Sequence, residues 1–147
     1  MLNNRWAGVE IYIEACYHAQ MKKKGKIIPN GVSLERHEYE TILVFTELGY
    51  DVSLIPKSNL KGVHTADIII KGEQWEMKCP RGSGRWLSEN TLKKASRQSE
   101  NIIIDLARIK IHQAKCIKEL EKQFYKIKQI HKMLIVTKSK KVIDYTK

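Results

Sequence analysis

The chain has 147 residues, of which 42% are hydrophobic and 29% charged, which indicates a single folded domain and excludes a disordered tail or a low-complexity protein. It carries 27 Lys and Arg against 16 Asp and Glu, and the resulting net charge of +11 points to a polyanionic partner such as nucleic acid. The entire excess lies in residues 76–147, because basic and acidic side chains balance in residues 1–75. A lysine-rich solvated surface is the alternative explanation of this charge.

The predicted elements begin with a helix and a basic linker within residues 1–27. Trp6, Val9, Ile13 and Cys16 recur at helical spacing, and a lysine run with Gly and Pro then breaks the pattern. The remaining residues, 28–147, are predicted to form the main domain.

A second helix is predicted from its cap, Ser33, to a stop at Gly49. Three strands follow it, at residues 50–55, 66–70 and 73–79. The last two flank Lys71-Gly72, whose composition is typical of a two-residue hairpin turn.

The second half of the chain continues with a helix from its cap, Ser88, to about Glu100, and an apolar strand at residues 101–106. A long amphipathic helix and two short strands complete it, at residues 109–128, 133–137 and 141–145. We therefore expect an α/β fold with a mixed central sheet. Its core has the order αβββαβ, and the C-terminal helix and two strands are added to that core.

Neither the cysteines nor the hydropathy suggest a thiolate metal site or a membrane span. Cys16, Cys79 and Cys116 show no CxxC spacing and no histidine placed to complete a zinc cluster. No stretch approaches the roughly 18 apolar residues of a membrane span, and the N-terminus lacks the pattern of a signal peptide. We expect the chain to act in a reducing, soluble compartment, unless it is a piece of an exported protein.

Carboxylates and a lysine on adjacent predicted strands are the strongest chemical signal. Glu76 and Lys78 share one face of a strand because side chains at i and i+2 point the same way, and the hairpin brings Asp67 alongside Glu76. Such carboxylates, with Glu38 on the preceding helix, form a site for Mg²⁺, with Mn²⁺ or Zn²⁺ as alternatives. Lys78 can then orient or help deprotonate an attacking water and offset charge on phosphorus.

The Glu-X-Lys triplet alone has little weight in so lysine-rich a chain; the surrounding order of elements makes it specific. The alternative is a solvent-facing pair of strand residues.

Downstream, a Pro-Arg-Gly-Ser-Gly-Arg loop and the next helix contain groups that can bind a phosphate backbone or stack on a base. The candidate nucleic-acid-binding residues are Arg81, Arg85, Trp86, Lys93, Lys94, Arg97 and Gln98.

Histidines provide the parts of a different, metal-free mechanism, in which the ribose 2′-hydroxyl attacks the phosphate with histidine as acid and base. His37, His64, His112 and His131 are isolated in the sequence, and His64 is of most interest because it lies three residues before Asp67.

An Asp followed by Glu-X-Lys on the next strand, within an αβββαβ order, resembles the PD-(D/E)XK nuclease superfamily. Residues 35–55, 65–106 and 133–145 resemble more closely the tRNA-cleaving C-terminal toxin domain of CdiA contact-dependent growth inhibition proteins. The resemblance covers roughly residues 28–147 and leaves residues 1–27 outside it.

The resemblance implies a metal-dependent tRNase that is delivered into neighbouring bacteria, acts in the cytoplasm of the target cell and is neutralised by a cognate immunity protein. It places Asp67, Glu76 and Glu38 on the metal positions, Lys78 on the lysine position and Gln98 near the metal. Ala66 stands where the superfamily's name has proline. Hydrolysis of this kind leaves a 5′-phosphate and a 3′-hydroxyl. An inhibitor that covers a basic cleft is expected to be acidic.

Two other functions remain open on the sequence alone. A DNA-directed PD-(D/E)XK endonuclease of a mobile element would use the same residues to cut the DNA backbone instead of RNA. A non-catalytic nucleic-acid-binding module would keep the fold and show salt-dependent binding with no metal requirement.

Overall fold

The computed structural model describes residues 23–147, so the helix predicted near the N-terminus lies outside the described residues. The strands are β1 (Ile27–Ile28), β2 (Val52–Leu54), β3 (Ile68–Ile70), β4 (Glu73–Lys78), β5 (Asn101–Asp105), β6 (Lys132–Val136) and β7 (Val142–Thr146). The helices are α2 (Arg36–Glu47), α3 (Leu87–Ala95) and α4 (Gln113–Lys126). The predicted αβββαβ core, the C-terminal helix and the two closing strands are all present.

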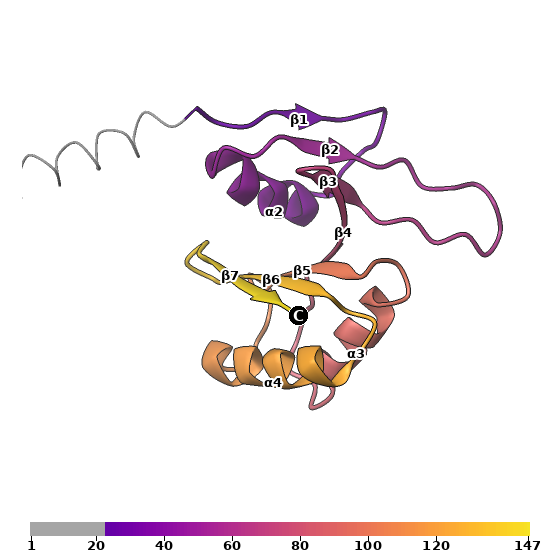
Figure 1. Ribbon diagram of the computed structural model, residues 1–147. Coiled ribbons are helices and arrows are strands. Elements are labelled where there is room, and N and C mark those ends of the chain that lie inside the picture. Colours follow the sequence, from indigo (N-terminus) through magenta and orange to yellow (C-terminus); the bar gives the residue numbers. More distant parts are fainter. Residues whose placement is uncertain (1–22) are drawn as a thin grey trace, which may run out of the picture.

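These strands form one seven-stranded mixed sheet in which the spatial order follows the chain order (Figure 1). β2, β3 and β4 form an antiparallel meander, whereas β4, β5 and β6 are parallel, and β7 returns antiparallel to β6. All five residues of β5 are buried, as expected for a central strand between two parallel neighbours. The mixed sheet confirms the predicted fold class.

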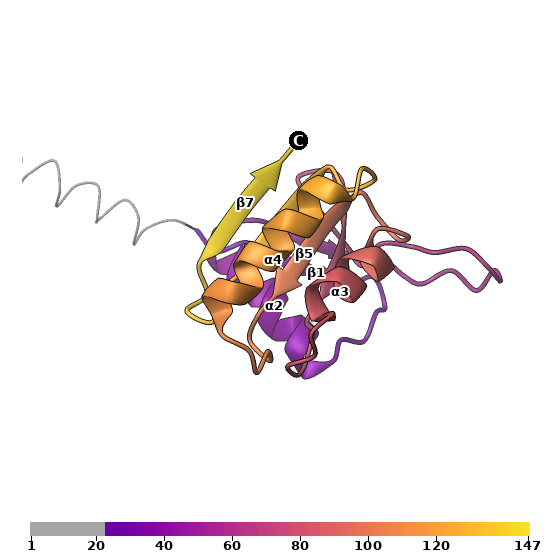
Figure 2. The same ribbon diagram turned by 90° about the horizontal axis from the view of Figure 1, so that it is seen from below.

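Helices cover the two faces of the sheet unequally, α2 on one face and α3 with α4 on the other (Figures 1 and 2). Alternation along β5 sends Ile103 to the core beneath α2, and Ile102 and Ile104 to the core beneath α3 and α4. Two separate hydrophobic cores therefore hold the domain together. No helix within residues 23–147 has both the length and the apolar character needed to span a membrane.

The hairpin between β3 and β4 fixes the register of the residues of interest. Ile70 pairs with Glu73 across the turn, and both turn residues, Lys71 and Gly72, have positive φ angles of 51° and 76°. Two left-handed residues in succession define the type I′ turn whose twist matches that of the flanking strands. The predicted two-residue turn is therefore confirmed.

The boundaries of α2, α3 and α4 differ from the sequence prediction. α2 is capped by Glu35 rather than Ser33, because the side chains of Glu35 and Glu38 form a reciprocal capping box. The N-cap of α3 is Trp86, so Ser88, the predicted cap, lies inside the helix; α3 ends at Ala95, before the predicted Glu100, and a turn follows it. α4 begins at Gln113, later than predicted, because Ile109 forms a β-bridge with Gly82. The two-residue strand β1 lies in what the sequence indicated to be a linker.

Candidate active site

The hairpin brings Asp67 alongside Glu76, as its register predicts. The backbone amide of Asp67 donates to the carbonyl of Trp75 at 3.0 Å, and the amide of Met77 donates to Asp67 Oδ2 at 2.8 Å. The Asp67 carboxylate is thereby oriented by the neighbouring strand. Glu76 pairs with Ile102 of β5, so its side chain lies on the α3 and α4 face of the sheet.

Glu76 is a buried carboxylate with one unsatisfied oxygen. The residue is only 1% exposed; Oε1 forms a 2.6 Å salt bridge with Lys78 Nζ, and Oε2 has no hydrogen-bond partner. Its pKa is raised to about 7, mainly by burial; the bond to Lys78 opposes the shift, and the proximity of Asp67 adds to it. A buried carboxylate oxygen without a partner is costly unless a cation or donor completes it.

Lys78 is held between two acceptors, and the second comes from another element. Its Nζ donates to Gln98 Oε1 at 3.0 Å, and Gln98 lies in the turn that follows α3. Asp67 directly before β3, Glu76 and Lys78 on β4, and Gln98 after α3 thus form one cluster. We call it the catalytic cluster after the role predicted for Asp67, Glu76 and Lys78.

A cleft of about 640 Å³ begins at Lys78 and runs along the loop after β4 to the first turns of α3. Its walls include Arg81, Arg85, Trp86 and Lys94, four of the residues predicted to bind nucleic acid. The Trp86 ring is 58% exposed, and the Arg85 guanidinium lies over it at 4.9 Å from the ring centroid. An exposed aromatic ring and cationic side chains therefore line a groove that starts at the catalytic cluster.

Residues 64–142, more than half of the chain, match the family model of the contact-dependent growth inhibition CdiA C-terminal domain. The chain belongs to this family. The matched range contains the whole catalytic cluster and the cleft beside it.

A search of solved structures finds a similar fold in the CdiA-CT/CdiI toxin and immunity complex from Burkholderia pseudomallei. The TM-score is 0.61 at 17% sequence identity, and the match covers 84% of this chain and 100% of that chain. At this identity the likeness shows the fold alone. No curated protein matches the chain.

Glu38 is not gathered into the catalytic cluster of this CdiA C-terminal domain. Its Oε2 accepts the backbone amide of Glu35 at 2.9 Å, as part of the cap of α2. Within residues 23–147, no three His, Cys, Asp or Glu residues lie close enough to hold a metal ion together. The predicted set of three carboxylates is thus reduced to Asp67 and Glu76.

The remaining nucleic-acid-binding candidates, Lys93 and Arg97, lie on α3 and just after it, and neither lines the cleft. Lys93 is paired with Glu89 on the helix, and Arg97 is exposed just beyond its end. The four histidines instead lie on separate elements: His37 in α2, His64 in the β2–β3 loop, His112 at the cap of α4, and His131 before β6. They form no shared acid and base site.

Sequence reasoning missed two polar contacts that shape the domain next to the site. Asp105, at the end of β5, is 1% exposed and accepts the Thr41 hydroxyl at 2.6 Å. Arg108 donates through Nε to Cys79 Sγ at 3.3 Å, and also to the Cys79 carbonyl, which fixes the chain directly after Lys78. The only sequence signal for the first contact is a single Asp that ends an apolar run.

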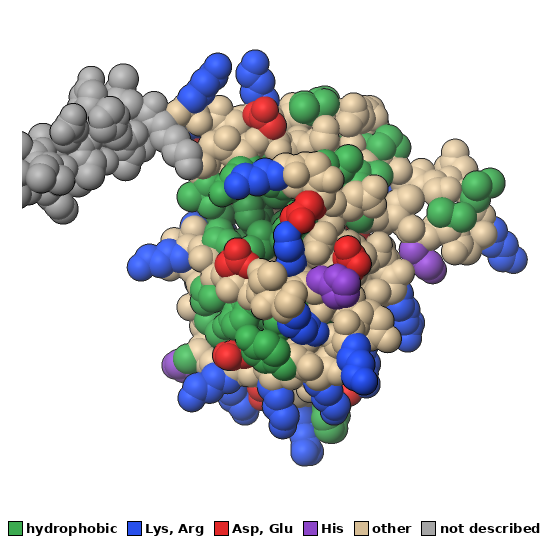
Figure 3. All heavy atoms as spheres, in the orientation of Figure 1, with side chains coloured by type: hydrophobic (Ala, Val, Ile, Leu, Met, Phe, Trp, Pro, Cys, Tyr) green, Lys and Arg blue, Asp and Glu red, His purple; other side chains and the backbone are tan. Residues whose placement is uncertain are grey.

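Figure 3 shows a basic surface and, apart from it, an apolar hollow with charged side chains at its rim. Lys and Arg gather over α4 at the bottom of the view, and an apolar hollow opens between α2 and β7. That hollow, of about 340 Å³, is lined by Phe45, Trp75 and Leu134 among others, on the face of the sheet opposite Glu76. It is therefore separate from the catalytic cluster.

Proposed function

We propose that this CdiA C-terminal domain is a divalent-metal-dependent endonuclease that cleaves tRNA and acts as an interbacterial toxin. The observation that carries the proposal is Glu76, whose buried, unpartnered Oε2 lies beside Asp67 and the salt-bridged Lys78. A structural ion pair would satisfy both carboxylate oxygens, whereas a cation site leaves one available.

The residues present fit a hard divalent cation. Asp67 and Glu76 would hold it through carboxylate oxygens, and two such ligands suit Mg²⁺, which keeps several waters. Mn²⁺ accepts the same ligands, while the lack of nitrogen or sulfur donors in the cluster disfavours Zn²⁺. When bound, the ion would supply Lewis-acid activation of the phosphate and of the attacking water.

Lys78 would supply a positive charge at the site, and Gln98 would help to position its ammonium group. Gln98 and Glu76 hold the ammonium group from two directions, so its place beside the carboxylates is set before substrate arrives. From there Lys78 can donate to the water or to a phosphate oxygen and offset the charge that develops on phosphorus.

The cleft beside Lys78 would grip the substrate. Arg81 and Lys94 can contact phosphates, and the exposed Trp86 ring with Arg85 over it can stack on an unpaired base. Unpaired bases favour RNA loops over duplex DNA as the substrate. A DNA-directed enzyme is the second candidate, since the catalytic cluster itself does not select the sugar.

A cognate immunity protein is the expected partner. The similar Burkholderia pseudomallei structure is a complex of a toxin with its immunity protein. For this chain, an inhibitor that covers the cleft would meet Arg81, Arg85 and Lys94 and should be acidic.

The decisive assay incubates the purified chain with total tRNA and with plasmid DNA, each with Mg²⁺ and with excess EDTA. We expect Mg²⁺-dependent cleavage of tRNA that yields 5′-phosphate ends, and no cleavage by Lys78→Ala. Lys128→Ala, which removes an exposed lysine far along the chain from the cluster, is the matched control and should retain activity.

Each outcome discriminates between the candidates. Cleavage of plasmid but not tRNA would favour the DNA-directed enzyme. Full activity in EDTA with a 2′,3′-cyclic phosphate product would refute the metal mechanism and favour histidine chemistry. Salt-dependent binding without cleavage of either substrate would leave the non-catalytic module.

A further inference from the structure

The loop between β2 and β3 is unusually long for a hairpin connection. Leu54 pairs with Ile68, and the Ile55 amide donates to the Asp67 carbonyl at 2.9 Å, so residues 56–66 form a closed loop on this base. Most hairpin loops have about two to five residues, and longer ones without secondary structure are commonly functional. We call residues 56–66 the β2–β3 arm.

The arm projects from the body of the domain. It extends beyond the sheet in both views of the ribbon (Figures 1 and 2). Eleven residues that run out and back can reach about 16 Å. Few bonds stiffen it: the Leu60 amide donates to Ser58 Oγ at 3.1 Å, and the Val63 amide donates to the Leu60 carbonyl at 3.2 Å.

The chemistry of the arm is basic and apolar, without any acidic residue. Leu60 is 72% exposed and Val63 49% exposed, and Figure 3 shows apolar and basic side chains together on this projection. Lys57 and Lys61 form no ion pair within the described part of the chain. Exposed apolar groups between unpaired cations are typical of a binding surface.

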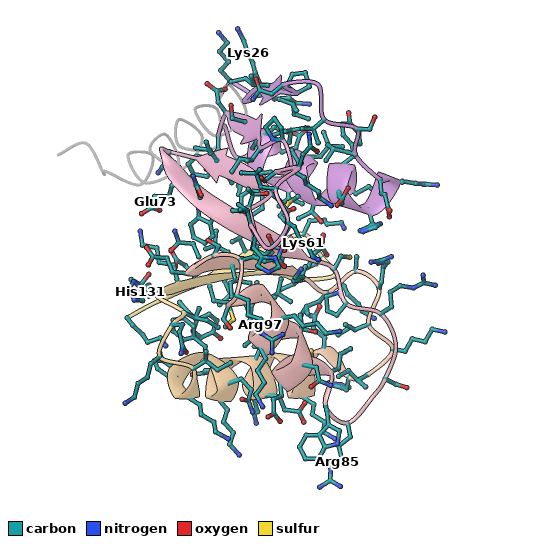
Figure 4. The ribbon with its side chains drawn as sticks, turned by 90° about the vertical axis from the view of Figure 1, so that its right-hand side faces the viewer. Lys26, Lys61, Glu73, Arg85, Arg97 and His131 are labelled. Atoms are coloured by element: carbon teal, nitrogen blue, oxygen red, sulfur yellow. The ribbon has the colours of Figure 1, made fainter. Side chains whose placement is uncertain are left out.

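The position of the arm ties it to the catalytic cluster, because its base is Asp67 itself. Figure 4 looks onto the side from which the arm projects; Lys61 lies at the centre of the view, and Arg97 lies below it, just beyond the end of α3. The cluster joins these two parts, since Gln98 follows Arg97 and binds Lys78. Cations therefore lie on both of the segments that adjoin the cluster.

We propose that the β2–β3 arm is a second substrate-binding element, which clasps a structured RNA against the cleft at α3. Lys57 and Lys61 would contact phosphates, and Leu60 and Val63 would pack against a base or ribose in an unpaired segment. The inference rests on the proposed nuclease function. The lack of acidic groups and the direct link to Asp67 favour RNA as the occupant over a protein partner.

The test measures tRNA binding in a Lys78→Ala background, so that no substrate is cut, over a series of salt concentrations. Each lost phosphate contact reduces the slope of log affinity against log salt by about one. We expect Lys57→Ala/Lys61→Ala to reduce that slope by about two and to weaken binding on the order of tenfold. Lys23→Ala/Lys26→Ala is the control of equal charge; Figure 4 shows Lys26 at the opposite end of the domain from Arg85 of the cleft.

A second variant tests the apolar contact. Leu60→Ser/Val63→Ser with intact Lys78 should raise the KM for tRNA several-fold, with little change in kcat and none in the salt slope. Equal slopes in the arm and control lysine variants, while the wild type cleaves tRNA, would overturn the inference and leave the nuclease proposal intact. Loss of immunity-protein binding with unchanged tRNA binding would overturn it too and assign the arm to the inhibitor. A wild type that neither binds nor cleaves RNA would instead refute the proposed function.

Discussion

Two buried carboxylates on neighbouring central strands differ in how many of their oxygens accept a hydrogen bond. Glu76 of β4 and Asp105 of β5 are each 1% exposed, but they point to opposite faces of the sheet. Asp105 is satisfied at both oxygens, by the Thr41 hydroxyl at 2.6 Å and by the Ala107 amide at 2.9 Å. Glu76 is satisfied at Oε1 and has no partner at Oε2.

The difference separates a structural carboxylate from a functional one. A buried acceptor without a partner costs roughly 1–3 kcal/mol, whereas a satisfied acceptor contributes to stability. Asp105 joins the end of β5 to α2 through its hydrogen bond with Thr41, and so helps to hold α2 on its face of the sheet. Glu76 keeps one oxygen unpaired beside Asp67 and Lys78 on the other face, which is the arrangement that a cation would complete.

The largest expected effect comes from Glu76→Gln, which keeps the shape and removes the charge. We expect the cleavage rate to fall on the order of a thousandfold or more, because the amide cannot replace a carboxylate toward a divalent cation. The fold should persist, since the amide oxygen can still accept from Lys78. Initial rates on tRNA and circular dichroism spectra check both statements.

Glu73→Gln is the matched control on the same strand. Glu73 is paired with Lys132 rather than with the cluster, so this variant should cleave at nearly the wild-type rate. A Glu76→Gln enzyme with normal activity would show that Glu76 is structural like Asp105 and remove the basis of the comparison.

The next effect is a dependence of stability on pH that originates at Glu76. Its pKa is about 7 in the folded chain against 4.5 for an ordinary glutamate, mainly because burial disfavours the charged form. Between these values the folded state retains a proton that the unfolded state has released, so folding stability falls as pH rises. The full shift corresponds to a loss of about 3 kcal/mol in folding stability. Below about pH 4 none of this stability is lost, and by about pH 8 the loss is complete.

Urea unfolding of wild type and Glu76→Gln at several pH values measures this contribution. The stability of Glu76→Gln relative to wild type should increase from pH 5 to pH 8, and the difference between them cancels the titration of other groups. A difference that stays constant over this range would mean that Glu76 titrates normally in the folded chain.

Local patterns predicted the architecture well, because the signals are short-range. Lys71-Gly72 specifies the hairpin, and the hairpin register alone brings Asp67 to Glu76. The unbroken apolar run of β5 indicated a central strand. Helix ends were less predictable: the capping box of Glu35 and Glu38 competes with the plausible cap Ser33, and a single sequence does not show which of them prevails.

The parts of the site that escaped prediction depend on long-range contacts. Glu38, which was expected to bind the metal, instead accepts a hydrogen bond from the backbone amide of Glu35. This bond belongs to the capping box that makes Glu35, rather than Ser33, the cap of α2. The contact between Thr41 and Asp105 joins residues 64 positions apart, and no local pattern encodes it. Gln98, in contrast, was proposed from the superfamily resemblance, and it lies against Lys78.

The smallest predicted effect tests the structural half of the comparison, through Thr41→Val. This change removes the hydroxyl that satisfies Asp105 Oδ2 and leaves a buried carboxylate oxygen without a partner, as in Glu76. We expect a loss of about 2 kcal/mol in the free energy of unfolding, with an unchanged cleavage rate per folded molecule. Thr46→Val is the control, because Thr46 is also buried in α2 but donates only to the Leu43 carbonyl of its own helix, so its loss should be smaller. If the two variants lose the same stability, the Asp105 contact adds nothing beyond the replacement of a buried threonine. If folded Thr41→Val cleaves tRNA more slowly than the wild type, the contact between Thr41 and Asp105 also contributes to the reaction.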